Sequence, residues 1–163
     1  EHLSFQLERD LELYYNLDAN VINGSVSGDT SSSGLNRLEW TLPDKIDLVI
    51  LCLGANDMLR GINPDTIKKN LQQIISIIKS KKINILLAGI QAPESYGEIY
   101  KKDFDEIFYE LSKENDIPLM PFLLEGVALN ASLNQPDGMH PNYNGIKIIS
   151  KNLSKSIISV KNL

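Results

Sequence analysis

Two nearly uninterrupted apolar runs constrain the fold more than any other feature of this sequence. They are DLVILCLG, residues 47–54, and INILLAGI, residues 83–90. Each has the length and the Val, Ile and Leu content of a strand that is buried on both faces. Between them, Asn63-Pro64 provides a capping residue and a proline suited to the first helical position. A strand–helix–strand order predicts a crossover connection and a parallel sheet.

The rest of the chain continues this alternation of helices and strands. The helix after Pro64 carries apolar residues at helical spacing, namely Ile67, Leu71, Ile74, Ile75 and Ile78. Similar spacing predicts further helices around residues 3–14, 35–40, 104–111 and 146–157, the last capped by Asn142. NVING (20–24) and IPLMPF (117–122) read as short strands. The pattern predicts one α/β domain over residues 1–163, with a doubly wound parallel sheet in a three-layer α/β/α arrangement.

In sheets of this kind, chemistry lies in the loops at the carboxyl ends of the strands. The corresponding loops here are residues 25–34, 54–63, 91–97 and 123–141.

The composition excludes several classes of function. A formal net charge of −5 argues against non-specific binding to nucleic acid or to an anionic membrane surface. The densest basic run, Lys79 to Lys82, is interpreted as a solvated helix end. The longest apolar runs fall short of the roughly 18 residues of a membrane span, and residues 1–16 lack the pattern of a signal peptide.

Cysteine and histidine are too scarce for a metal or disulfide framework. The single Cys52 permits no disulfide within the chain and lies in an apolar strand, where burial would make its thiol inert. His2, at the beginning of the chain, is predicted to be an exposed bystander. With these residues far from His140 in the sequence, a zinc site is not expected.

The sequence DGMHP, residues 137–141, places Asp137 three residues before His140. A carboxylate that accepts the Nδ1 proton of an imidazole fixes its tautomer and leaves Nε2 as a general base. The alternative is an Asp-Gly turn with a histidine that happens to lie near a helix start.

Two other loops offer donors for a developing negative charge. Gly28, in VSGDTSSSG, could donate its backbone N–H, and Asn56, in LGAND, its side-chain amide. The alternatives are a loop that caps the next helix through Thr30 or Ser31, and a turn at Asn56. The first loop could also bind phosphate, as in a flavin-binding electron carrier. Neighbouring Asp29 and Asp57 are expected to fix these loops by accepting backbone hydrogen bonds.

Together, VINGSVSGDTSSSGLNRLEW, DLVILCLGANDMLRG and PDGMHPNYNG resemble the second, third and fifth blocks of the SGNH (GDSL) hydrolases, in order and spacing. The sequence is most similar to the branch of thioesterase I, lysophospholipase L1 and arylesterase. APESYG resembles the substrate-side loop of that branch in Pro93, Tyr96 and Gly97. The resemblance covers nearly all 163 residues and implies a flavodoxin-like fold with strand order 2-1-3-4-5.

The resemblance assigns roles to the residues already singled out. His140 would be the general base, Asp137 the acid that orients it, and Gly28 and Asn56 the oxyanion donors. The nucleophilic serine of the family's Gly-Asp-Ser-Leu block has no counterpart among the 163 residues, and neither has the first, central strand that precedes it. We expect both to lie upstream of Glu1, and we expect this chain alone not to be the complete native fold. The absent initiating Met fits this interpretation.

The function implied is hydrolysis of carboxylic esters or acyl thioesters, with short- to medium-chain, lysophospholipid or aryl substrates. The expected partner is thus a small-molecule ester or thioester, with no cofactor, nucleic acid or stable membrane insertion, and a monomer is favoured. Location stays open between cytoplasm and export. Leu123, Leu124, Val127 and Leu129 could line an acyl groove or belong to the core. The alternatives are an SGNH-like module that binds acyl or glycan ligands without turnover, and a flavodoxin-like electron carrier.

Overall fold

A computed structural model of the chain describes residues 3–160, which form two compact units. The central unit comprises residues 24–122, and the terminal unit combines residues 3–23 with residues 123–160. The prediction for His2 lies outside the described residues.

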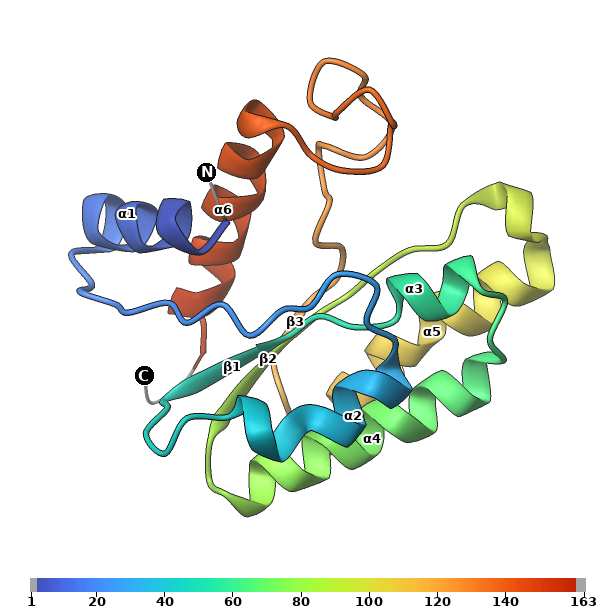
Figure 1. The fold of residues 1–163 in the computed structure, drawn as a ribbon, viewed down its shortest axis with the longest axis horizontal. Helices are drawn as coiled ribbons and strands as arrows, with labels where there is room; N and C mark the ends of the chain where they lie inside the picture. The colour runs from blue at the N-terminus through green and yellow to red at the C-terminus, as the bar shows by residue number, and fades with distance from the viewer. Residues whose placement is uncertain (1–2, 161–163) are drawn as a thin grey trace. The chain divides into compact units, whose positions relative to one another are not determined.

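The central unit is built on a small parallel sheet (Figure 1). Strands β1 (Leu48–Leu51), β2 (Asn84–Ala88) and β3 (Leu119–Met120) follow one another in the order β1-β2-β3. Ile50 pairs with Leu86, and Leu87 pairs with Leu119. Both pairings are parallel, which confirms the sheet type predicted from the two apolar runs.

Residues 31–41, 64–80 and 98–115 form helices that contain the predicted apolar spacing, whereas the short helical segments 55–59 and 94–96 lie in regions predicted as loops. In chain order, these elements are α2 (Ser31–Thr41), α3 (Ala55–Leu59), α4 (Pro64–Ser80), the 3₁₀ turn η1 (Glu94–Tyr96) and α5 (Glu98–Asn115). The Asn63 side chain accepts a hydrogen bond from the N–H of Asp65 at 2.8 Å, which confirms the predicted cap of α4. The apolar stripe of α4 is fully buried, as predicted: Ile67, Leu71, Ile74, Ile75 and Ile78.

One face of the sheet carries the main hydrophobic core. Ile85 and Leu87 of β2 pack with the α4 stripe, with Leu38 of α2 and with Phe104 of α5, so α2, α4 and α5 cover the same face (Figure 1). Leu86 and Ala88 point to the opposite face of β2, since side chains alternate along a strand, and are fully buried as well. Strand β2 therefore has the two buried faces that its sequence predicts.

The terminal unit pairs α1 (Leu3–Tyr15) with α6 (Tyr143–Ile158). Leu7 and Leu11 of α1 and Leu153 and Ile157 of α6 are almost fully buried. A buried hydrogen bond of 2.6 Å from the Ser150 hydroxyl to Asp10 also joins the two helices. Residues 140 positions apart in the sequence thus form one unit.

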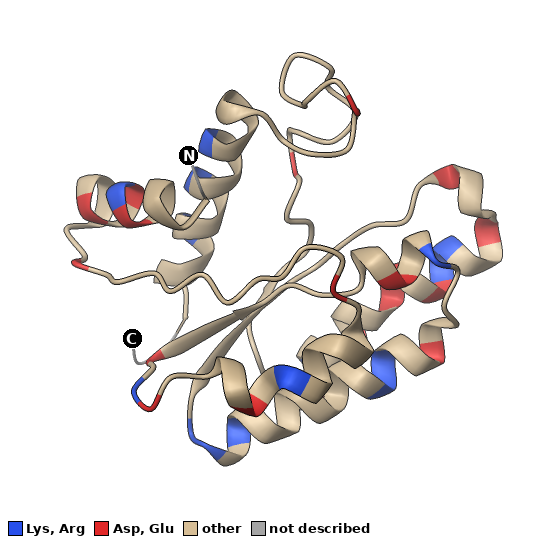
Figure 2. Ribbon diagram, in the orientation of Figure 1, with Lys and Arg blue, Asp and Glu red and all other residues tan. Residues whose placement is uncertain are grey.

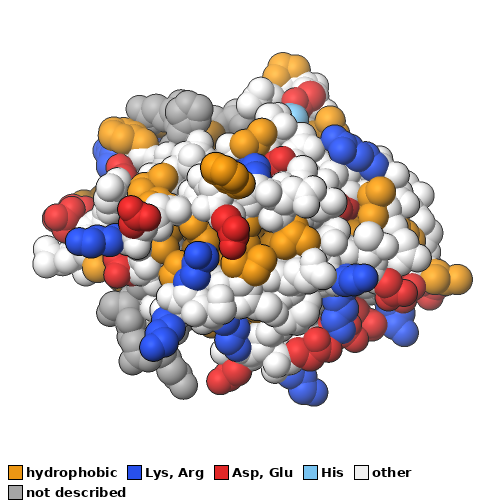
Figure 3. Space-filling view, turned by 60° about the horizontal axis from the view of Figure 1, so that its bottom comes forward, with side chains coloured by type: hydrophobic (Ala, Val, Ile, Leu, Met, Phe, Trp, Pro, Cys, Tyr) orange, Lys and Arg blue, Asp and Glu red, His pale blue; other side chains and the backbone are white. Residues whose placement is uncertain are grey.

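Positions of charged residues are dispersed along the helices and the loops between them (Figure 2). Lys79, Lys81 and Lys82 are exposed at the end of α4, as predicted. Apolar side chains also reach the surface (Figure 3). Trp40 of α2, the last apolar residue of the predicted helical segment 35–40, is 93% exposed.

Several strand predictions also need correction. Residues 20–24 form no strand, and β3 is shorter than residues 117–122. The first three residues of β1 are only half-buried, and Cys52 is exposed where burial was predicted. Among residues 3–160, β1 pairs with β2 alone, so it is an edge strand. A strand needs a neighbouring strand to complete its ladder of hydrogen bonds. Within residues 3–160, no strand pairs with the outer edge of β1 or with residues 20–24.

Candidate active site

Asp137 and His140 lie on a tight loop of the terminal unit, just before α6. The backbone of Asn134 pairs with that of Pro141, and the N–H of Gln135 donates to the carbonyl of His140 at 2.7 Å. Gly138, with φ of 71°, makes the turn in a conformation that L side chains rarely adopt. The predicted Asp-Gly turn is therefore present, and it brings Asp137 back toward His140.

The Asp137 carboxylate is held on both oxygens. Oδ2 lies 2.7 Å from Nδ1 of His140, while Oδ1 accepts the N–H groups of Met139 and His140 at 2.9 and 3.0 Å. The backbone hydrogen bond from His140, its imidazole and the N–H of Met139 lower the pKa of Asp137 to about 2. The His140 side chain is 68% exposed. With Nδ1 engaged by a charged carboxylate, Nε2 is left for proton exchange with a ligand.

Two asparagines hold this loop in place. Asn134 is buried, and its Nδ2 donates to the carbonyls of Val127 and Asn130, both at 2.8 Å. Asn142 accepts the N–H groups of Asn144 and Gly145, which confirms the predicted cap of α6. The role of Asn134 was not predicted, because its partners carry no local sequence signal.

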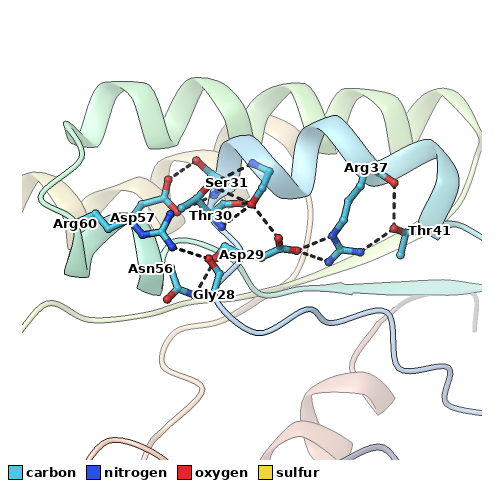
Figure 4. A network of polar contacts seen from close by, with 10 residues as sticks. Gly28, Asp29, Thr30, Ser31, Arg37, Thr41, Asn56, Asp57 and Arg60 are labelled. Atoms are coloured by element: carbon cyan, nitrogen blue, oxygen red, sulfur yellow. Dashed lines mark hydrogen bonds and ion pairs between the residues drawn. The ribbon is translucent and has the colours of Figure 1, made fainter.

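Gly28 forms a turn in the central unit. The N–H of Asp29 donates to the carbonyl of Val26 at 3.2 Å, and Gly28 has φ of 83°, as the third residue of a type II turn does. The Gly28 carbonyl accepts a hydrogen bond of 3.1 Å from Arg60 (Figure 4). The Gly28 N–H has no hydrogen-bond partner within residues 3–160, so it can donate to a ligand.

Asn56 lies in α3, directly after β1. Its Nδ2 donates to the carbonyl of Asp29 at 2.9 Å (Figure 4). An amide carries two N–H groups, and the second one has no partner in the described part of the chain. The first hydrogen bond therefore fixes the amide plane while the other N–H remains available. Asn56 is helical, so the alternative of a turn with unusual backbone angles is wrong.

Asp57 anchors the start of α2 from inside the core. It is 1% exposed, and it accepts the N–H of Ser31 at 2.7 Å and the hydroxyl of Ser31 at 2.6 Å. This confirms the prediction that Asp57 accepts a hydrogen bond from a backbone N–H group. Asp29 instead accepts from side chains, namely the hydroxyl of Ser33 and the guanidinium of Arg37 (Figure 4).

This arrangement argues against a phosphate site in the Ser25–Gly34 loop. Thr30 caps α2 and accepts the N–H of Ser33, while the N–H of Ser31 is bound by Asp57. Two of the first helical N–H groups are thus already satisfied, one of them by a carboxylate that would repel a phosphate. The loop caps its helix, as one of the alternatives predicted.

Pro93 and Tyr96 lie in the loop that follows β2, within or next to η1. Pro93 is exposed, and the ring of Tyr96 stacks on Tyr100 of α5 at 5.7 Å between centroids. This loop and α3 both follow the carboxyl ends of parallel strands, where ligand sites of such sheets occur.

The apolar residues of the 123–141 loop, which were predicted either to line an acyl groove or to belong to the core, do not share one environment. Val127 is fully buried and belongs to a core, whereas Leu129 is 98% exposed.

Within residues 3–160, no group of three or more His, Cys, Asp or Glu side chains could hold a metal ion. None of the helices there combines the length and the apolarity that crossing a bilayer requires.

Comparison with known proteins identifies the relatives of the chain. Residues 3–148 match the profile of the GDSL-like Lipase/Acylhydrolase family. An arylesterase of Vibrio mimicus is 42% identical over 133 residues, which make up 81% of this chain. Thioesterase 1/protease 1/lysophospholipase L1 of Escherichia coli K12 is 39% identical over 138 residues, or 84% of this chain. In each case the match covers 66% of the relative, so the chain spans slightly less than two thirds of their length.

A solved structure also resembles the fold. The crystal structure of AlinE4, an SGNH-hydrolase family esterase, has a TM-score of 0.81 and 37% sequence identity, covering 97% of this chain and 85% of that one. This likeness confirms the predicted fold class, that of the SGNH hydrolases.

Proposed function

Because the chain belongs to the GDSL-like lipase/acylhydrolase family, we propose that the complete protein hydrolyses carboxylic esters or acyl thioesters by acyl transfer to a serine. His140 is the general base and Asp137 the residue that orients it. Gly28 and Asn56 donate hydrogen bonds to the oxyanion. The observation that carries the proposal is the 2.7 Å contact between Nδ1 of His140 and Oδ2 of Asp137, because it fixes the tautomer that a serine nucleophile requires.

The nucleophile in this proposal comes from outside the 163 residues, which contain no Gly-Asp-Ser-Leu sequence. Nε2 of His140 takes the serine proton as the serine oxygen attacks the acyl carbonyl. The tetrahedral intermediate then collapses, and the imidazolium gives its proton to the leaving alcohol or thiol. Water repeats the sequence on the acyl-enzyme and releases the carboxylic acid.

Preorganised donors support the assignment of Gly28 and Asn56. The Gly28 carbonyl is held by Arg60 and the Asn56 amide by the Asp29 carbonyl. Donors that are already fixed need no reorganisation as negative charge develops on the substrate oxygen, which is the main source of their effect on rate.

The names of the relatives indicate the substrate class. They include an arylesterase and a thioesterase that is also a lysophospholipase. We therefore expect aryl esters, acyl thioesters or lysophospholipids with short to medium acyl chains. Pro93 and Tyr96, in the loop after β2, are proposed to contact the acyl or alcohol portion.

The test is turnover by the full-length protein that contains these residues. We expect hydrolysis of p-nitrophenyl butyrate and of a short acyl-CoA, and a loss of about 10³-fold or more in kcat for His140→Ala. Lys155→Ala, an exposed substitution on α6, is the control and should match the wild type. A full-length protein that binds these esters without releasing acid would instead be a binding module, and the proposal would be wrong.

A further inference from the structure

The loop 91–97 is attached to α5 near its beginning, at the buried residue Ala92. Ala92 is 2% exposed, and side chains rather than backbone satisfy both of its main-chain polar groups. Its N–H donates to Oδ1 of Asp105 at 2.8 Å, and its carbonyl accepts from Nζ of Lys101 at 2.8 Å. Two side chains of α5 thus hold the backbone N–H and the carbonyl of one residue that follows β2.

Lys101 and Asp105 also form an ion pair with each other. Nζ of Lys101 lies 2.7 Å from Oδ2 of Asp105, one helical turn away. The two side chains are only 25% and 24% exposed. The hydrogen bond that Lys101 donates to Asp105 raises the pKa of Lys101, so the cation persists well above neutral pH. Hydrogen bonds to charged groups are shorter and stronger than neutral ones. We call Lys101 and Asp105 the Ala92 clamp.

A second attachment lies at the other end of the loop. The Tyr96 ring stacks on Tyr100, which stacks on Phe104 at 6.1 Å and donates its hydroxyl to the carbonyl of Ile62 at 2.8 Å. Residues 93–95, between Ala92 and Tyr96, are exposed. The loop therefore has a short exposed crest, residues 93–95, and contacts α5 on both sides of it.

We propose that Lys101 and Asp105 are positioning residues that set the acyl-chain preference of the enzyme by holding this crest in one conformation. The inference rests on the proposed ester hydrolysis and on the substrate role of Pro93 and Tyr96. A long acyl chain gains binding energy from a preformed surface and loses part of it when that surface must be ordered on binding. An acetyl group makes far fewer such contacts, so the clamp favours longer chains over short ones.

The experiment compares p-nitrophenyl esters from acetate to decanoate, with the full-length protein. In Lys101→Met, which keeps the length of the side chain but not its charge, the ratio of kcat/KM for octanoate to that for acetate should fall by roughly fivefold to tenfold. The change should come mainly through KM for the longer esters. Lys101→Arg still donates to the Ala92 carbonyl and should restore most of the ratio.

Lys68→Met is the matched control. Lys68 bridges α4 to Glu110 and Glu114 of α5 and has a similar exposure of 29%, but it makes no contact with Ala92. Its loss removes an ion pair of α5 without releasing the loop. An equal shift of the octanoate ratio in this variant would overturn the proposal, since the effect would then come from α5 as a whole.

The result can fail in two distinguishable ways. A wild-type protein inactive on every ester would refute the proposed function, and the acyl preference with it. An active wild type whose chain-length profile is unchanged by Lys101→Met would refute the clamp alone. If that variant does not fold, Asp105→Ala, which removes the acceptor of the Ala92 N–H, takes its place, and an unchanged profile there has the same meaning.

Discussion

At the scale of single residues, Asp137 is the group whose chemistry the structure defines most fully. Its pKa of about 2 lies below the ordinary 3.8 because hydrogen bonds stabilise the charged form. The interactions of this carboxylate are therefore complete above about pH 4 and are lost only as the pH falls through about 2. We therefore expect protonation of Asp137 to cause no loss of kcat/KM between pH 4 and 8. A pH–rate profile of the full-length enzyme measures this.

Asp137→Asn provides the control for that profile. The amide keeps the shape of the side chain but removes the charge that holds the Nδ1 proton, so kcat should fall by about 10³–10⁴-fold. A variant with nearly full activity would show that His140 is oriented by something other than Asp137.

At the scale of elements, α2 and α3 depend on one buried carboxylate. Asp57→Ala would leave the N–H and hydroxyl of Ser31 buried without an acceptor. We expect the free energy of unfolding to drop by about 2–4 kcal/mol, measured by urea denaturation of the full-length protein. Asp57→Asn retains one acceptor oxygen and should lose less. Equal losses in the two variants would contradict this account.

Some helices and strands could be predicted from the sequence, and others could not. Helix α4 was predictable because its cap, Asn63, and its apolar stripe are local signals. The 20–24 segment has the composition of a strand, but strand formation depends on a neighbour, and local sequence does not contain that information. Cys52 is exposed for the same reason, since the burial of an apolar strand depends on what lies on either side of it.

At the scale of the whole molecule, the residues to which the family resemblance assigns roles are divided between the units: Gly28 and Asn56 belong to the central unit, and Asp137 and His140 belong to the terminal unit. Their roles stay predictions, which rest on the order of the motifs and on the chemistry that each residue type can perform. The Ala92 clamp, formed by Lys101 and Asp105, was not predicted. An i,i+4 Lys–Asp pair is common on exposed helices, and only the folded chain brings it to a backbone in another loop.

The terminal unit is discontinuous, which bears on the prediction that residues 1–163 belong to one domain. Its two segments are separated in sequence by the whole central unit, so pairing α1 with α6 closes a loop of 127 residues, 16–142. The entropy of closing that loop is smallest when the intervening chain is already folded. We therefore expect the two units of the full-length protein to unfold in one cooperative step.

Hydrogen exchange can test this cooperativity directly. Leu11→Ala truncates a side chain in α1 that is 2% exposed and should destabilise the protein by about 2–5 kcal/mol. If unfolding is cooperative, the slowest amides of α4, in the other unit, should lose the same free energy of protection as those of α6. Leu13→Ala, on the exposed side of α1, should leave both unchanged. A loss confined to α6 would mean that the chain folds as two independent domains, because the central unit would then keep its stability without the other.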